Sequence, residues 1–345
     1  MRRHQHTLAP TGPAPDPRYQ ANLPTTDSTL ESCSSPRGRV CLPPMKFRAH
    51  TLRIILALVA VYVIWGSTYL AIRFAIDSLP PFTMAGLRFV AAGLFMFTVG
   101  KLSSAPMPTR SEWQGAALIG VLMLVCGNGA VCWAEKTVPS GLASLMVATV
   151  PLWAVVLSTL LPGGTRPAPR AIVGILCGLV GVFVLVQPQK SGSIDPAGAA
   201  ALLLASVSWA AGSVFSKRVK LPSSPVLSTA MQMLCGGSLL LLLGSLRGEW
   251  SQIDPQAVTL KSILSVGYLM LFGSVIGFTA FVWLLRNTTA IVATSYAYVN
   301  PLVAVLLGWA YNGETPSSRT FVAGLMVIFA VALITTAGPP KAKTA

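Results

Sequence analysis

Charge is what this 345-residue sequence has little of. Only 10% of its residues are charged and 53% are hydrophobic, whereas about a quarter of an average soluble domain is charged. This deficit excludes a soluble protein. The formal charge of +15 does not indicate a nucleic-acid partner either, because the basic residues are dispersed along the chain and are not clustered on one soluble domain.

Residues for catalysis and metal binding are also scarce. All three histidines precede residue 51, no carboxylate pair lies in an apolar segment, and neither a phosphate-binding loop nor a metal motif is present. The six cysteines lack metal-ligand spacing, and four of them fall inside apolar segments, where cysteine packs as a small apolar residue. The sequence therefore predicts no enzyme activity, no cofactor and no metal site, and it does not support ATP-driven transport.

Apolar segments dominate the chain after about residue 50. Most of them are near or above the ~20 residues that cross a hydrocarbon core. Lipid cannot satisfy open backbone groups, and the alternation typical of a membrane barrel is absent, so these segments are expected to be helices. We predict an all-α integral membrane protein with ten transmembrane helices, at 53–76, 82–100, 113–134, 138–161, 170–187, 196–215, 226–245, 262–285, 288–310 and 319–337.

The two ends of the chain are polar. Residues 1–44 are rich in Pro, Ser, Thr and Arg, and they lack the continuous apolar region of a signal peptide. Their composition predicts a disordered tail, and Met45 is an alternative start of translation. Lys and Arg residues are concentrated before the first predicted helix and in alternate loops, which predicts that both termini, including a C-terminal tail at 338–345, are cytoplasmic.

The sequence contains an internal repeat, so that residues 53–187 and 196–337 each hold five predicted helices. Because five is odd, the second repeat crosses the membrane in the opposite orientation. This arrangement is typical of inverted-repeat transporters, whose substrate site lies near the midplane between the repeats. Shifts of 144 residues early and 150 residues late in each repeat align Trp65 with Trp209, Arg73 with Lys217, Gly127 with Gly277, Trp133 with Trp283, Lys136 with Arg286 and Pro151 with Pro301.

Proline interrupts two of the predicted helices at corresponding positions. Pro151 and Pro301 lie about halfway along the fourth and ninth helices, where each removes a helical hydrogen bond at a cost of about 3 kcal/mol. A cavity, water or a substrate can satisfy the carbonyls that such breaks expose. The alternative is a packing kink that was duplicated with the repeat.

Polar side chains at membrane depth are candidates for binding substrate. Arg88 is the strongest, because a charge inside the membrane is costly and a guanidinium can hold a carboxylate; the alternative is that it extends to the interface. Its repeat mate is Gln232. Asn128 can donate to a substrate or bridge two helices. Glu135 is a candidate for carrying a coupling proton if it is desolvated, and the alternative is an exposed loop acid beside Lys136.

Aromatic and amide side chains deep in the predicted helices are further substrate-binding candidates. Trp65, Trp209, Tyr296 and Tyr298 lie too deep for an interfacial belt, so we expect them to line a cavity; interface anchoring is their alternative role. Asn300 lies just before the second proline, and a buried amide needs partners.

Six stretches of the sequence together resemble one known family. They are similar to the EamA-domain branch of the drug/metabolite transporter superfamily, most closely its YedA-like bacterial inner-membrane exporters, over roughly residues 45–337. The resemblance implies ten helices in two EamA repeats and the export of small metabolites, amino acids or drugs. Gln232 stands where the subgroup is expected to have an acid. The stretches are "VYVIWGSTYLAIRFAI", "AGLRFVAAG", "SGLASLMVATVPL", "WAAGSVFSKRVKLP", "GYLMLFGSVIGF" and "ATSYAYVNPLVAVLLG".

We interpret the chain as a secondary exporter of the bacterial cytoplasmic membrane that works by alternating access. Its expected partners are a small-molecule substrate and the lipid bilayer, and homodimer formation is left open. A nucleotide-sugar or sugar-phosphate exchanger of the same superfamily is the alternative, which calls for more than one cation inside the membrane. A non-transporting scaffold or a membrane enzyme is a remote alternative.

Overall fold

The computed structural model describes residues 45–103, 105–138, 140–162, 165–186, 195–312, 318–337 and 341–342. The chain divides into two units, Met1–His50 and Thr51–Ala345, and the second unit contains the fold discussed below. The predicted disordered tail at 1–44 lies outside the described residues, as does most of the tail at 338–345.

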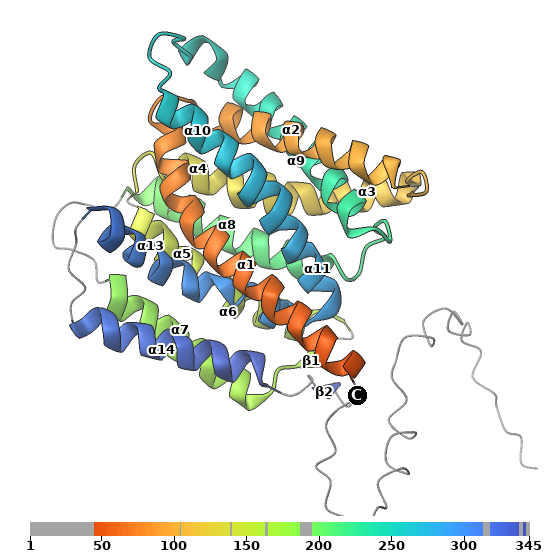
Figure 1. The fold of residues 1–345 in the computed structure, drawn as a ribbon, viewed down its shortest axis with the longest axis vertical. Coiled ribbons are helices and arrows are strands. Elements are labelled where there is room, and N and C mark those ends of the chain that lie inside the picture. Colours follow the sequence, from red (N-terminus) through yellow and green to blue (C-terminus); the bar gives the residue numbers. More distant parts are fainter. Residues whose placement is uncertain are drawn as a thin grey trace, which may run out of the picture. The chain divides into compact units, whose positions relative to one another are not determined.

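The described residues are almost entirely helical (Figure 1). Two-residue strands, β1 (Thr165–Arg166) and β2 (Lys341–Ala342), form one antiparallel pair. The first half of the sequence forms α1 (Met45–Ile76), α2 (Pro81–Leu102), α3 (Arg110–Gly120), the π-helix η2 (Val121–Gly129), α4 (Ala130–Ala134), α5 (Ser140–Val147), α6 (Val150–Leu160) and α7 (Pro169–Val186). The second half forms α8 (Pro196–Phe215), α9 (Pro225–Leu246), the 3-10 helix η3 (Glu249–Gln252), α10 (Leu260–Tyr268), the π-helix η4 (Leu269–Phe278), α11 (Thr279–Asn287), α12 (Ala290–Thr294), α13 (Tyr296–Asn312) and α14 (Ser318–Thr335).

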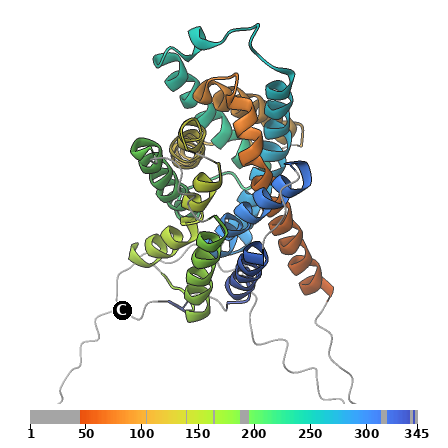
Figure 2. The same cartoon turned by 90° about the vertical axis from the view of Figure 1, so that its left-hand side faces the viewer.

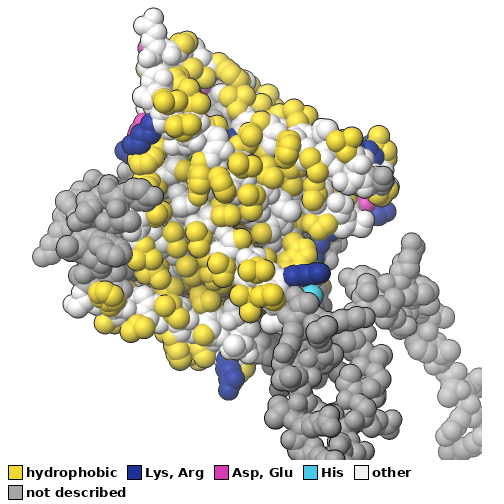
Figure 3. Space-filling view, viewed as in Figure 1, with side chains coloured by type: hydrophobic (Ala, Val, Ile, Leu, Met, Phe, Trp, Pro, Cys, Tyr) yellow, Lys and Arg dark blue, Asp and Glu magenta, His cyan; other side chains and the backbone are white. Residues whose placement is uncertain are grey.

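Seven helical segments of the described chain are long and apolar enough to cross a membrane, and three shorter apolar helices accompany them. The shorter ones, at 169–184, 290–303 and 321–335, fall on the fifth, ninth and tenth predicted spans. The helical membrane fold is therefore confirmed, whereas ten crossings stay a prediction. Hydrophobic side chains are spread over the whole face seen in Figure 3, and Lys and Arg lie toward its edges, as expected of a surface in contact with lipid.

Several helices begin where the sequence provides a cap. Pro is in the first turn of α2, α8 and α9, where its missing N–H costs no helical bond. The Asp195 carboxylate accepts from two backbone amides at the start of α8, and Ser224 caps α9. These caps explain why the observed helices start within a few residues of the predicted ones.

The helices pair across the two halves of the sequence. α2 packs along α9 and α7 packs along α14, so the second helix of one half lies on the second of the other, and the fifth on the fifth. Figures 1 and 2 show α7 and α14 together at the bottom of the view. α8 packs against η2, α4, α5 and α6. Elements from both halves therefore meet in the centre of the bundle.

Two of the predicted long helices are interrupted near their prolines. α5 ends at Val147 and α6 begins at Val150, with Pro151 in its first turn. The corresponding break in the second half lies at Ser295, upstream of Pro301, and α13 continues through Pro301. The sequence did not predict the π-helices η2 and η4, which occupy corresponding places in the third helix of each half.

Candidate functional site

A cavity opens between the two halves of the sequence. Its walls come from α1, α2, η2, α4, α5 and α6 in the first half and from α8, η4 and α13 in the second. It offers about 80 Å³ to the centres of water-sized molecules, and one water needs roughly 10–15 Å³ by this measure. The cavity therefore has room for several waters, and a larger solute requires it to widen.

Arg88 is the single charged residue among the described residues that line this cavity. It is 4% exposed, and its Nη2 donates a hydrogen bond to Asn128 Oδ1 over 2.5 Å. Its Nε has no hydrogen-bond partner, and no carboxylate of the described chain forms an ion pair with it. A buried cation without a counterion is costly. The cavity therefore presents one uncompensated positive charge.

Other polar atoms of the cavity also lack partners. They are the Nε1 donor of Trp209, the Oδ1 acceptor of Asn300 and the hydroxyl of Ser274. Buried polar atoms are normally hydrogen-bonded. These atoms and the free Nε of Arg88 are therefore available to a polar solute.

An aromatic cluster fills the bundle on one side of the cavity. It consists of Trp65, Trp209, Phe278, Phe281 and Tyr296, whose neighbouring ring centres lie 4.7–6.4 Å apart. These distances are typical of favourable aromatic pairs. Four of the five rings line the cavity, and Phe281, one turn after Phe278, packs behind them.

Each tryptophan of the cluster packs on a glycine from the other half of the sequence. A Cβ on Gly277 would lie 2.6 Å from Trp65 Nε1, and a Cβ on Gly127 would lie 2.7 Å from the Trp209 ring. Such distances exclude any larger residue unless the tryptophan moves. Both pairs follow the repeat shifts, so the internal repeat builds a two-fold related pair of Trp–Gly contacts. Trp65 Nε1 also donates to the carbonyl of Gly273 in η4 over 3.1 Å.

The two helix breaks are contacted in a symmetric way. The Ser206 hydroxyl of α8 donates to the carbonyl of Met146, beside the break between α5 and α6, over 3.1 Å. The Tyr62 hydroxyl of α1 is 2.7 Å from the Ser295 hydroxyl, at the break between α12 and α13. Tyr62 and Ser206 are 144 positions apart, which is the shift that aligns the first helices of the repeats. The first helix of each half therefore contacts the broken helix of the other.

The start of α8 lies beside the loop that follows α4. Thr137 Oγ1 donates to Asp195 Oδ2 over 2.7 Å. This hydrogen bond and those from the α8 backbone amides lower the pKa of Asp195. α8 begins beside this loop, so the residues that follow its last residue, Phe215, lie at the opposite end of the bundle.

Basic residues of the repeat make corresponding contacts at these opposite ends. Arg73 in the last turn of α1 donates from Nη1 to the backbone carbonyl of Glu135 over 2.7 Å. Its repeat mate Lys217, which follows α8, donates from Nζ to the backbone carbonyl of Thr288. We call the two regions the Arg73 end and the Lys217 end. In both, a cation joins the end of the first helix of a half to the loop that follows the third helix of the same half.

Glu135 follows Ala134, the last residue of the span at 110–134. It is 0% exposed, and neither of its carboxylate oxygens has a hydrogen-bond partner. Burial raises the pKa of Glu135 well above its usual range, and the charge of Arg73 opposes this shift. The alternative of an exposed loop acid is therefore wrong.

The structure brings six of the predicted substrate-binding residues to the cavity and leaves two elsewhere. Gln232 is buried away from it, with its Nε2 donating to Ser228 Oγ over 3.1 Å. Tyr298 is 0% exposed and packs on Gly178 of α7 in a separate apolar cluster. Both predictions are corrected, because the Gln232 amide is hydrogen-bonded within α9 and the Tyr298 ring packs against α7. The residues that line the cavity are Trp65, Arg88, Asn128, Trp209, Tyr296 and Asn300.

Sequence reasoning missed several small polar residues of the site. Thr68, Ser206 and Ser274 line the cavity, yet isolated hydroxyls in apolar helices carry no distinctive pattern. Applying the repeat shift to every polar residue would have paired Ser206 with Tyr62, so that signal was available. Ser274 had no comparable signal.

Comparison with known proteins assigns the family. Residues 52–187 and 196–336 both match the EamA-like transporter family. The chain belongs to this family. The two matched segments lie within the halves that supply the two walls of the cavity, and the resemblance drawn from the sequence motifs is confirmed.

Named relatives of this EamA protein are transporters of bacterial membranes and related proteins. The chain is 43% identical over 294 residues to the Escherichia coli inner membrane transporter YedA, covering 84% of this chain and 93% of that one. It is 28% identical to protein PecM of Dickeya dadantii, over 79% and 88% of the two chains. A solved crystal structure shares the fold, with a TM-score of 0.66 at 22% identity, over 82% of this chain and 96% of that one.

Proposed function

We propose that this EamA protein is a secondary exporter of small molecules with an anionic group, working by alternating access in the bacterial cytoplasmic membrane. The observation that carries the proposal is the position of Arg88, a buried cation without a counterion in a cavity between the two halves. Carboxylates bind guanidinium groups through strong, charge-assisted hydrogen bonds. Candidate substrates are metabolites, amino acids and drugs, and both termini are proposed to be cytoplasmic.

The surroundings of Arg88 support a solute with one polar and one apolar part. Asn128 and Asn300 supply amide groups near the charge, and the aromatic cluster supplies apolar surface. A nucleotide-sugar or sugar-phosphate substrate is less well supported, because Arg88 is the one cation among the described lining residues. Phosphate groups would call for more positive charge.

The repeat-related contacts support alternation between two states. The Arg73 end and the Lys217 end each have a cation on a backbone carbonyl, and the aromatic cluster lies toward the Lys217 end of the cavity. Opening one end while the other stays closed would expose the cavity to one side of the membrane at a time, as in other inverted-repeat transporters.

The test combines a metabolite-export screen in overexpressing cells with Arg88 variants. For an anionic or zwitterionic substrate so identified, Arg88→Gln is expected to weaken apparent affinity by about 1.5–3 kcal/mol, the value of a hydrogen bond to a charged group. Arg88→Lys is expected to lose less, because it keeps the charge but not the planar fork. Tyr298→Phe is the matched control, since Tyr298 is buried outside the cavity.

Membrane abundance and thermal stability are measured for every variant, because removal of a buried charged group also changes folding. Wild-type export with unchanged apparent affinity in Arg88→Gln would overturn the anionic-substrate proposal. Export of only neutral or cationic solutes by the wild-type protein would do the same.

A further inference from the structure

Glu135 is a buried acid that the cavity does not use. It lies at the Arg73 end, and it is absent from the residues that line the cavity. Its two carboxylate oxygens are buried and have no hydrogen-bond partner. An ionised carboxylate in such a place is costly, so a buried acid of this kind is either paired with a cation or neutral.

The fold does not require an acid at this position. The repeat mate of Glu135 is Leu285, which is 3% exposed and belongs to the main apolar core. The neighbouring residues correspond closely, since Trp133 matches Trp283 and Lys136 matches Arg286. An apolar side chain therefore fills the equivalent position in the second half. Packing alone does not explain the carboxyl group of Glu135.

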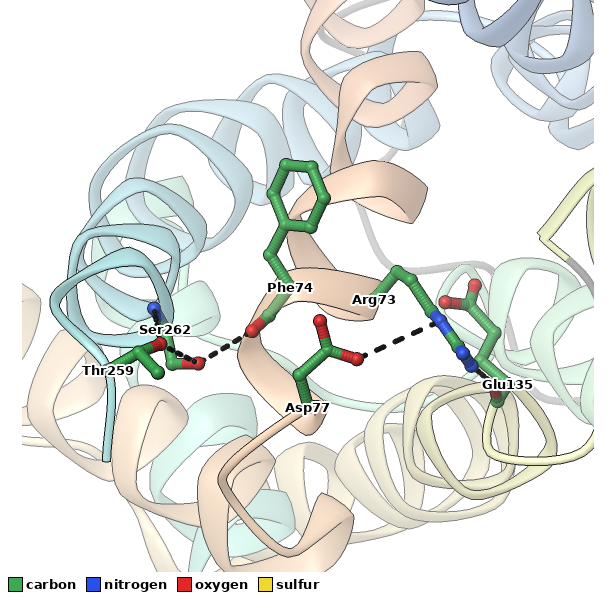
Figure 4. Close-up of polar contacts among 6 residues, drawn as sticks. All are labelled: Arg73, Phe74, Asp77, Glu135, Thr259 and Ser262. Carbon is green, nitrogen blue, oxygen red and sulfur yellow. Dashed lines mark hydrogen bonds and ion pairs between the residues drawn. The ribbon is translucent and has the colours of Figure 1, made fainter. Parts of the chain in front are cut away.

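A partly exposed cation lies beside Glu135 (Figure 4). Arg73 donates from Nη1 to the Glu135 backbone carbonyl, and its Nε is 3.9 Å from Oδ1 of Asp77. The side chains of Arg73 and Asp77 are 48% and 54% exposed. In Figure 4 the Arg73 guanidinium stands between the exposed Asp77 and the buried Glu135. Glu135 thus has a partly exposed guanidinium as its neighbour.

Other titratable groups connect Glu135 with the cavity. Tyr69, one turn before Arg73 in α1, lines the cavity together with Asn300. Cys132, three residues before Glu135, has its Sγ 3.5 Å from Oδ1 of Asn128, the oxygen that also accepts from Arg88. The titratable groups on Glu135's own loop and on the elements in contact with α4 or that loop are Tyr69, Arg73 and Asp77 of α1, Arg88 of α2, Cys126 of η2, Cys132 of α4, Lys136 of the loop and Asp195 before α8.

We propose that Glu135 is a proton-binding site that couples transport to the proton gradient; this inference rests on the proposed transport function. In the protonated state the neutral carboxyl group is accommodated by its apolar surroundings, and Arg73 holds the Glu135 backbone carbonyl. When the proton leaves, the carboxylate attracts the Arg73 guanidinium away from that carbonyl. The contact between α1 and the loop after α4 therefore depends on the proton, and both elements lead to the cavity.

The proton itself is the probe of the first experiment. Infrared difference spectra of the full chain in liposomes, recorded as the buffer pH is changed, report the carbonyl stretch of protonated carboxylic acids. We expect a carboxylic-acid band that is lost as pH rises through a midpoint above the ordinary glutamate value of roughly 4.3. Glu135→Gln should remove this band. Glu249→Gln is the matched control and should retain it, because Glu249 is also buried but accepts hydrogen bonds from Thr83.

A second pair of variants keeps the carboxyl group in place and guards against misfolding of Glu135→Gln. Arg73→Gln removes the nearby charge and should move the midpoint to higher pH, whereas Arg73→Lys should move it less. A band that survives Glu135→Gln, or one that does not change between mildly acidic and mildly alkaline buffer, would overturn the proposal. So would an identical midpoint in wild type and Arg73→Gln.

Because this titration needs no substrate, its outcome is separate from the transport assay. A titrating Glu135 in a protein that exports no solute in the screen would overturn the transport function and, with it, the coupling role. An exporter whose Glu135 does not titrate would overturn the coupling role alone. In an exporter with a titrating Glu135, Glu135→Gln should still export down a solute gradient but should lose the response to an imposed pH gradient.

Discussion

A methyl group at Gly277 tests the packing that holds the aromatic cluster. The Cβ of Gly277→Ala would lie 2.6 Å from Nε1 and 3.1 Å from Cδ1 of Trp65, where ordinary contacts are 3.4–4 Å. The indole has little freedom to move away. Its Nε1 donates to the Gly273 carbonyl, and its ring centre lies 4.7 Å from that of Tyr296 and 5.0 Å from that of Phe281.

The expected destabilisation follows from these contacts. Overpacking of a close-packed core costs about 1–3 kcal/mol, and loss of the Trp65 hydrogen bond adds about 1 kcal/mol. The higher helix propensity of alanine offsets up to about 1 kcal/mol. The free energy of unfolding of Gly277→Ala should therefore fall by about 1–3 kcal/mol.

The same membrane helix contains a matched control. A Cβ on Gly267 meets no atom within 4 Å, so Gly267→Ala should unfold at the wild-type temperature or slightly above it. The assay is thermal unfolding of the purified full chain in detergent, followed by a thiol-reactive dye that reports exposure of the buried Cys132. Combining Gly277→Ala with Trp65→Leu should recover part of the loss. Equal unfolding temperatures for Gly277→Ala and Gly267→Ala would refute the tight Trp65–Gly277 contact.

Three further predictions concern contacts between the two halves. Glu249→Gln should lower the free energy of unfolding by about 1–2 kcal/mol, because its carboxylate accepts from the backbone amide and hydroxyl of Thr83 at the start of α2; thermal unfolding measures this. Asp195→Ala should destabilise the protein at neutral pH. The difference in stability between Asp195→Ala and wild type should disappear as pH falls through the lowered pKa of Asp195, because the contacts that lower this pKa stabilise the folded state only while the carboxylate is ionised. Unfolding scans across pH check the sign. Ser206→Ala should cost about 1 kcal/mol through its lost bond beside the α5–α6 break, and a variant that unfolds like wild type would contradict that contact.

The sequence alone was sufficient for the membrane class, for the approximate positions of the helices and for the alignment of its two halves, but not for the breaks and π-helices within them. Long apolar runs and their caps are local features, so α8 has its predicted bounds and α2 differs from its prediction by one residue at the start and two at the end. The aligned pairs Trp65–Trp209 and Gly127–Gly277 were also visible in the sequence. Their physical meaning was not, because a repeat shift aligns positions without saying that each tryptophan contacts the glycine of the other repeat.

Only the tertiary structure decided which polar residues share one site. Arg88 and Gln232 occupy equivalent positions in α2 and α9, yet Arg88 faces the cavity and Gln232 lies in a part of α9 that packs closely on Gly120. Glu135 was readable as an exposed loop acid until its burial beside Arg73 was known. Apolar periodicity is weak in helices that are hydrophobic on every side. The direction in which each polar side chain points is therefore set by how neighbouring helices pack. The sequence of a single helix does not contain this information.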